Sequence, residues 1–151
     1  MNTPARAVFA LLVLACFLAF FISQHLKHTP TVLQSVRETP YFAPGVHGHE
    51  LEHISFKTKE ADLVTVTVQT AAGANVATLV NRTPVPRYRQ CEAVWNGLTG
   101  HGRLAPAGTY TLSFSFVRQD RTIPSPASFK LEARVASPPI PRGRTALTCI
   151  E

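Results

Sequence analysis

The chain has 151 residues, which leaves room for one ordinary domain with one hydrophobic core and short appendages. Only 16% of the residues are charged, and 12 prolines and 8 glycines separate the apolar runs, a pattern that favours short strands over long surface helices. The formal charge is +6, but Lys and Arg are scattered and form no dense block, so we do not expect a nucleic-acid partner.

The first predicted element is an apolar segment at residues 7–22, directly after Arg6. The segment is longer than the roughly 7 to 15 apolar residues of a signal peptide and shorter than the roughly 20 of a membrane-spanning helix. A helix continued through Leu26 has about the required length and places Lys27 near the headgroups. Because no A-x-A cleavage pattern ends the segment, residues 1–26 are predicted to form an uncleaved signal anchor, a transmembrane helix.

Two other fates of this segment stay open. The first is cleavage as a signal peptide, and the second is lipidation of Cys16, because Val13–Cys16 looks like a bacterial lipobox although apolar residues continue beyond it. With an uncleaved anchor, we expect a single-pass protein of the bacterial inner or cytoplasmic membrane, with its C-terminal domain outside the cytoplasm. A generally basic surface fits a position near anionic headgroups or wall polymers.

Beyond the anchor, residues 27–40 are polar without a sustained period, which predicts a linker. A folded domain is predicted for residues 41–135, where apolar and polar residues alternate with the period of a β-strand. The apolar phase is carried by Ile54 and Phe56, by Val64, Val66 and Val68, by Ala93 and Trp95, by Tyr110, Leu112, Phe114 and Phe116, and by Phe129, Leu131, Ala133 and Val135. A single sheet would leave one face of the large aromatic residues in water, so we expect two facing sheets.

Turn residues separate these runs at 72–75, 96–97, 106–108 and 124–126, which predicts about seven short strands. Residues 136–151 contain Ser137-Pro138-Pro139 near their start, and proline cannot donate the amide hydrogen bond of a central strand. This last segment is therefore predicted to be a flexible, Pro-rich tail.

A family resemblance rests on residues spread over positions 41 to 134. These are Tyr41-Phe42-x-Pro44, Gly73-x-x-Val76, Trp95-x-Gly97, Gly102, and Pro106-x-Gly108-Thr109-Tyr110. The arrangement resembles the Ig-like domain of flagellar hook-capping proteins (FlgD type). The resemblance implies an all-β, Ig-like antiparallel sandwich in an extracytoplasmic setting, and it says far more about fold than about a flagellar role.

Two departures from that family limit what the resemblance carries. Asn96 follows the tryptophan where the family usually has Asp, and residues 45–50 replace an acidic loop, so no cation-binding role is transferred. No hook-assembly region precedes the domain, which argues against a true hook cap.

Three histidines, His47, His49 and His53, form the one candidate metal cluster, because on a strand all three would point to the same face. Their spacing matches no standard zinc motif, so we favour a solvated loop and expect no metal and no cofactor. Cys91 and Cys149 could form a disulfide in an oxidising compartment, although nothing in the sequence brings their Cα atoms together.

Trp95 and Tyr110 lie on the apolar phase of their strands, so core packing is favoured over a sugar-stacking platform. The sequence contains no nucleophile elbow, phosphate-binding glycine loop or H-E-x-x-H motif, and we do not expect an enzyme. The expected function is a membrane-anchored protein-interaction or structural module of the bacterial cell envelope. The alternative is a domain that binds wall carbohydrate or a metal; a small-molecule ligand is otherwise not expected.

Overall fold

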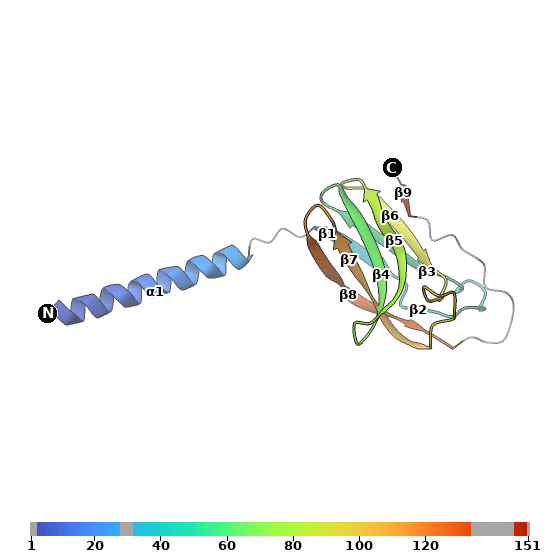
Figure 1. Cartoon of the computed structure of the whole chain (residues 1–151), viewed down its shortest axis with the longest axis horizontal. Helices are drawn as coiled ribbons and strands as arrows, with labels where there is room; N and C mark the ends of the chain where they lie inside the picture. The colour runs from blue at the N-terminus through green and yellow to red at the C-terminus, as the bar shows by residue number, and fades with distance from the viewer. Residues whose placement is uncertain (1–2, 28–31, 134–146, 151) are drawn as a thin grey trace. The chain divides into compact units, whose positions relative to one another are not determined.

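The computed structural model describes residues 3–27, 32–133 and 147–150 (Figure 1). The chain divides into two compact units, Met1–Thr31 and Val32–Glu151. The first unit holds one helix, and the second holds two β-sheets that form a sandwich. Residues 28–31 of the predicted linker, and residues 134–146 and 151 at the end of the chain, lie outside the described residues.

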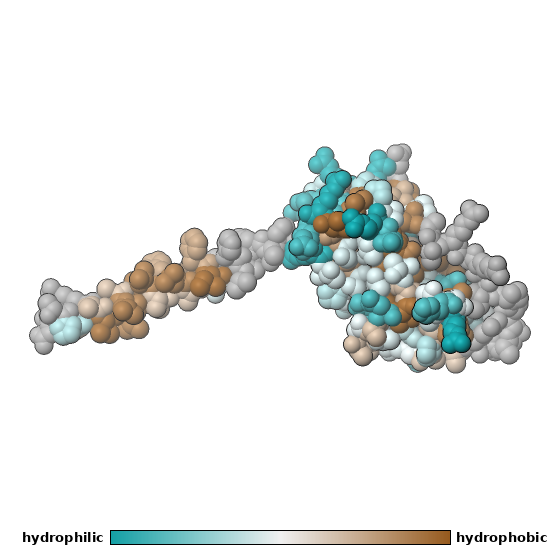
Figure 2. Space-filling model, viewed as in Figure 1, coloured by the Kyte–Doolittle hydropathy of each residue, from teal (hydrophilic) through white to brown (hydrophobic). Residues whose placement is uncertain are grey.

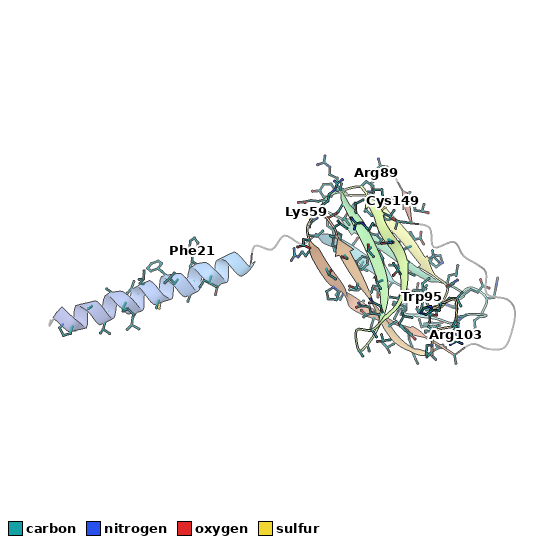
Figure 3. The ribbon with its side chains drawn as sticks, viewed as in Figure 1. Phe21, Lys59, Arg89, Trp95, Arg103 and Cys149 are labelled. Carbon is teal, nitrogen blue, oxygen red and sulfur yellow. A yellow bond between two sulfur atoms is a disulfide. The ribbon has the colours of Figure 1, made fainter. Side chains whose placement is uncertain are left out.

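Helix α1 spans Thr3–Lys27. Pro4 stands in its first turn, where the missing amide removes no helical hydrogen bond, and strong helix formers follow. Large apolar side chains from Val8 to Ile22 are exposed, and Phe21 is 74% exposed (Figure 3). Within the described residues, no helix reaches the length and hydropathy that crossing a bilayer requires, so the prediction of a transmembrane helix at residues 1–26 is not supported.

The sandwich is built from a four-stranded and a five-stranded sheet, whose strands are drawn as two layers in Figure 1. Strand order is β1-β3-β6-β9 in the first sheet and β2-β8-β7-β4-β5 in the second. The strands are β1 (Leu33–Glu38), β2 (Tyr41–Phe42), β3 (Glu52–Thr58), β4 (Asp62–Thr70), β5 (Asn75–Val85), β6 (Gln90–Trp95), β7 (Gly108–Phe116), β8 (Arg121–Leu131) and β9 (Thr148–Ile150). All pairings are antiparallel except that of β2 with β8, which is parallel.

The described residues thus contain nine strands, and the prediction of about seven was wrong at both ends of the domain. Strand β1 lies inside the predicted linker at 27–40, because it pairs along β3 and buries Leu33. Strand β9 lies inside the predicted tail at 136–151, because it pairs with β6. Neither strand has a clear period of two, so backbone pairing rather than side-chain alternation defines it.

The predicted turn at residues 124–126 is also wrong, since Pro124 and Pro126 lie within β8. Among the described strands, this half of β8 pairs only with β7, because the short β2 reaches no further than Lys130 and Leu131. On the other edge no described strand pairs with it, so the missing proline amides break no ladder hydrogen bond there.

The alternating residues meet between the two sheets and form one core. Trp95, from the four-stranded sheet, packs with its ring centroid 5.3 Å from Phe42, 5.3 Å from Tyr110 and 5.8 Å from Phe129, all from the five-stranded sheet. These tilted and edge-on contacts are the arrangements that aromatic rings favour. The facing sheets expected from the alternation are therefore present.

Candidate functional site

A cleft of about 660 Å³ lies at the end of the sandwich near Trp95. Its walls are the turn between β4 and β5, residues 71–74, and the loop between β6 and β7, residues 96–107. This loop contains most of the residues on which the family resemblance rests. In the structure, its glycines and Asn96 shape the turns of the loop.

The first half of the loop is a tight turn held by hydrogen bonds between Leu98 and the side chains of Trp95 and Asn96. The indole Nε1–H donates to the Leu98 carbonyl at 2.8 Å, and the Asn96 side chain accepts from the Leu98 amide at 3.1 Å. Gly97 has a φ of 77°, and a Cβ there would lie 3.1 Å from Cγ of Pro44. Glycine is required at Gly97 both by the left-handed backbone and by this close approach.

The second half of the loop folds back on itself and reaches across to β5. The Thr99 amide donates to the Arg103 carbonyl at 2.7 Å, with Gly102 at a φ of 73° in the bend. The Gly100 amide then donates to the Val76 carbonyl at 2.9 Å, which joins the loop to the other wall. The cleft is thus held by backbone hydrogen bonds from both sides.

The cleft carries the positive charge of Arg103. Arg103 and His101 are exposed at its edge, and the residues that line it include no Asp or Glu. In the described part of the chain, no carboxylate lies within ion-pair distance of the Arg103 guanidinium. Leu104, 39% exposed, supplies an apolar surface beside these groups. A ligand with an anionic group next to an apolar part fits this arrangement, because a guanidinium binds carboxylates in two-pronged geometry.

The three predicted histidines do not act together. His47 is fully exposed and lies 3.7 Å from Glu50, whereas His49 stacks on Tyr41 with ring centroids 4.9 Å apart. Both histidines belong to a chain of turns between β2 and β3 rather than to a strand. The premise that one strand face would present all three was therefore wrong.

His53 alone lies on a strand, and its Nδ1 is 2.7 Å from Glu92 Oε1 on the neighbouring β6. Each histidine thus has its own neighbours. Among the residues that the structure describes, no group of three or more His, Cys, Asp or Glu side chains could hold a metal ion.

Cys91 and Cys149 are joined by a disulfide. Cys91 is fully buried on β6, and Cys149 lies directly opposite it on β9. The bond holds a strand of only three residues against the sheet. It is the covalent link between the end of the described chain and the body of the sandwich.

The motif residues have structural rather than ligand-binding environments. Trp95 and Tyr110 are buried, and the Tyr110 hydroxyl donates to the Pro106 carbonyl at 2.6 Å, so neither ring is displayed for a sugar. Gly108 begins β7, where the chain leaves the loop. These positions support the cleft, while two residues that the sequence did not single out lie at its edge: Arg103, which provides its charge, and His101.

The buried carboxyl group of Glu52 and the half-buried one of Glu38 were also missed. Glu52 is fully buried, and its Oε1 accepts the Thr39 amide at 2.6 Å, while Glu38 accepts a hydrogen bond from the Ser125 hydroxyl. The second oxygen of each carboxyl group is buried without a hydrogen-bond partner among the described residues. Sequence alternation contained the signal, because Glu52 shares its strand face with the buried Ile54.

The electrostatic state of these acids follows from their surroundings. Burial raises the pKa of Glu52 to about 8, the Thr39 amide opposes this rise, and the nearby Glu38 adds to it. Burial also raises the pKa of Glu38, against the effect of the Ser125 hydrogen bond. Glu52 is therefore protonated at neutral pH in the folded protein.

No model of a protein family matches this chain, and no curated protein matches it either. The resemblance to hook-capping domains therefore depends on the motif residues alone.

Proposed function

We propose that this chain is a membrane-anchored, extracytoplasmic Ig-like module that contacts another protein of a bacterial cell envelope, and that it is not an enzyme. The observation that carries the proposal is the exposure of the apolar side chains of α1, in a chain whose sandwich has a complete core of its own. Figure 2 shows this helix as an almost continuous hydrophobic surface.

Covering α1 with lipid removes a large energetic cost. Phe9, Phe17 and Phe21 are each more than 65% exposed, and burying one large apolar side chain contributes roughly 1.5 to 3 kcal/mol. This supports attachment to a membrane through α1. The helix does not reach the length and hydropathy of a membrane span, so what we propose is attachment of this apolar surface to a membrane and not a crossing.

The compartment is supported by the disulfide. Bonds of this kind persist in oxidising surroundings such as the bacterial periplasm or cell surface and are rare where thiols are kept reduced. The Cys91–Cys149 bond therefore favours a sandwich outside the cytoplasm. The motif resemblance points to the same setting.

The contact surface that we assign to the partner is the cleft with His101 and Arg103. Its positive charge and the exposed Leu104 suit an acidic segment of another protein with an apolar side chain next to its carboxylate. Wall carbohydrate is the second candidate, favoured by the threonine hydroxyls at Thr70 and Thr109 in the same lining. No observation favours the metal-binding alternative.

The test has two stages, the first of which concerns attachment and compartment. Membranes from cells that make the full chain are washed at alkaline pH, and intact cells are treated with protease. We expect the chain to stay with the membranes and the sandwich to be digested from outside. Release by the wash, or a sandwich protected in intact cells, would contradict the anchor or its orientation.

The second stage identifies the ligand class. A photo-crosslinking residue in place of His101 is expected to capture one envelope protein, and the charge reversal Arg103→Glu is expected to abolish the capture. Arg37→Glu, at an exposed position on β1, is the matched control and should change nothing. Retention by wall polysaccharide with no protein crosslink would favour the carbohydrate alternative.

A further inference from the structure

The end of the sandwich at which the chain enters β1 is built from three loops. They are the loops between β3 and β4, between β5 and β6, and between β7 and β8. Hydrogen bonds bring them together with Val32: Lys59 N–H to the Val32 carbonyl at 2.8 Å, Tyr88 N–H to the Thr58 carbonyl at 2.8 Å, and Arg118 N–H to Asp62 Oδ1 at 2.8 Å. We call this the entry end.

Basic side chains outnumber acidic ones on the surface of the entry end. The exposed basic residues are Lys59, Arg87, Arg89 and Arg118, and the exposed acidic ones are Glu60 and Asp120. Asp62 is buried, and its Oδ1 accepts backbone amides. Lys59 and Arg89 lie toward one end of the sandwich and Arg103 toward the other (Figure 3), so the entry end is distinct from the cleft.

Tyr88 gives this surface an aromatic centre. It is 50% exposed, and it stands between Arg87 and Arg89 in the loop after β5. Its φ is 60°, in the left-handed region that a bulky residue rarely adopts. The packing of the domain does not explain why a strained backbone exposes a tyrosine ring to water, so we look for a role at the surface.

A tyrosine flanked by arginines is the combination found where proteins meet lipid headgroups. The tyrosine ring is apolar with a polar tip and favours the membrane interface, while arginine reaches phosphate oxygens. Polar side chains gather around a smaller apolar patch at the entry end in the view of Figure 2. A basic surface with an exposed tyrosine suits an anionic one that has an apolar layer beneath it.

The length of the connecting chain favours a bilayer over other anionic surfaces. Only residues 28–31 separate α1 from Val32. Even a fully extended connection of that size spans no more than about 18 Å. If α1 is held in lipid, Val32 cannot be far from the headgroups, and weak charge interactions act at a high effective concentration.

We propose that the entry end docks on the headgroups of anionic lipids, with Tyr88 in the interface and Arg87, Lys59 and Arg118 over phosphate groups. This inference rests on the proposed attachment of α1 to a membrane. It names the lipid as a second partner of the sandwich itself, and it leaves the cleft with Arg103 at the other end available.

The experiment is hydrogen exchange on the full chain reconstituted into vesicles. One set contains only phosphatidylcholine, and the other contains roughly 30% phosphatidylglycerol to give an anionic surface. In the anionic vesicles, exchange at residues 86–89 is expected to slow by roughly fivefold or more, the effect of one Lys or Arg at such a surface. Exchange at residues 99–104 should not change, and about 0.5 M salt should remove the difference.

Two variants separate docking from folding. The double variant Arg87→Gln/Tyr88→Gly should lose the lipid effect while the domain stays folded, because glycine adopts the φ of 60° without strain. Arg103→Gln, at the opposite end, is the control and should keep the full effect.

Each other outcome overturns the inference in its own way. If the chain is bound to vesicles but residues 86–89 exchange equally in both lipids, docking is refuted and the attachment of α1 stands. Protection by an acidic peptide or a nucleic acid in detergent, without protection by anionic vesicles, would replace the lipid with that macromolecule. A chain that does not associate with vesicles at all would refute the proposed function and this inference with it.

Discussion

The buried carboxyl group of Glu52 makes the stability of the sandwich depend on pH in a direction opposite to that of most acidic residues. In the folded protein its pKa is about 8, against an ordinary value of 4.5. Between these values the unfolded chain carries an ionised Glu52 and the folded chain a protonated one. The stability that Glu52 contributes to the folded state is therefore fully present below about pH 4.5 and is lost as the pH rises toward 8.

The size of the effect follows from proton linkage. Folding binds one proton in this window, so the free energy of unfolding falls by about 1.4 kcal/mol per pH unit. Between about pH 5.5 and 7.5 the wild type should lose on the order of 2 to 3 kcal/mol through this group. Glu52→Gln removes the titration, and its side-chain oxygen can still accept the Thr39 amide.

The assay is urea unfolding of the full chain in a mild detergent, followed by the fluorescence of Trp95 at several pH values. We expect the stability of Glu52→Gln relative to wild type to rise by about 2 to 3 kcal/mol from pH 5.5 to 7.5. Glu60→Gln, at an exposed loop position, should show no such trend. A constant difference between Glu52→Gln and wild type across this range would refute the reasoning.

Three further predictions concern packing, the disulfide and the turn. Trp95→Ala should destabilise the sandwich by roughly 3 to 5 kcal/mol, measured by circular dichroism during urea unfolding, because it empties the centre of the aromatic cluster. Cys149→Ser should cost about 4 kcal/mol for a link between residues 58 positions apart, and wild type in reductant should unfold at the same urea concentration. Gly97→Ala should cost more than Gly102→Ala, since both have positive φ but only the first meets Pro44; equal losses would show that this contact is unimportant.

Local pattern was enough to predict the central strands. The alternation around Val66 and Phe114 specifies both the strand and the buried face, and the two segments pair directly in the sheet. The strands at the two ends of the domain were not predicted, because each is defined by pairing with a strand far away in the sequence. Leu33 pairs with Thr58, and Cys149 with Cys91, and no short window of sequence contains both members.

The candidate site was likewise predictable only where local sequence determines it. The sequence Trp95-Asn96-Gly97 predicted a turn, and the structure has one there, held by hydrogen bonds between Leu98 and the side chains of Trp95 and Asn96. The cleft, however, also needs the Gly100 amide to reach the Val76 carbonyl on another strand, which is a tertiary contact. For the histidines, the sequence favoured a solvated loop before the first strand, and residues 45–51 do form turns; the metal alternative depended on a common strand face, which these turns do not provide.

The position of β9 also sets an order of events during synthesis. Among the described strands it comes last along the chain, and it is the only one that pairs with β6 on that side. Until the residues around Cys149 have been made, Gln90, Cys91 and Glu92 are without this partner strand. In that interval a nascent domain can recruit a strand from a neighbouring chain, and the pairing of β9, held by the Cys91–Cys149 bond, covers these three residues with a strand of the same chain.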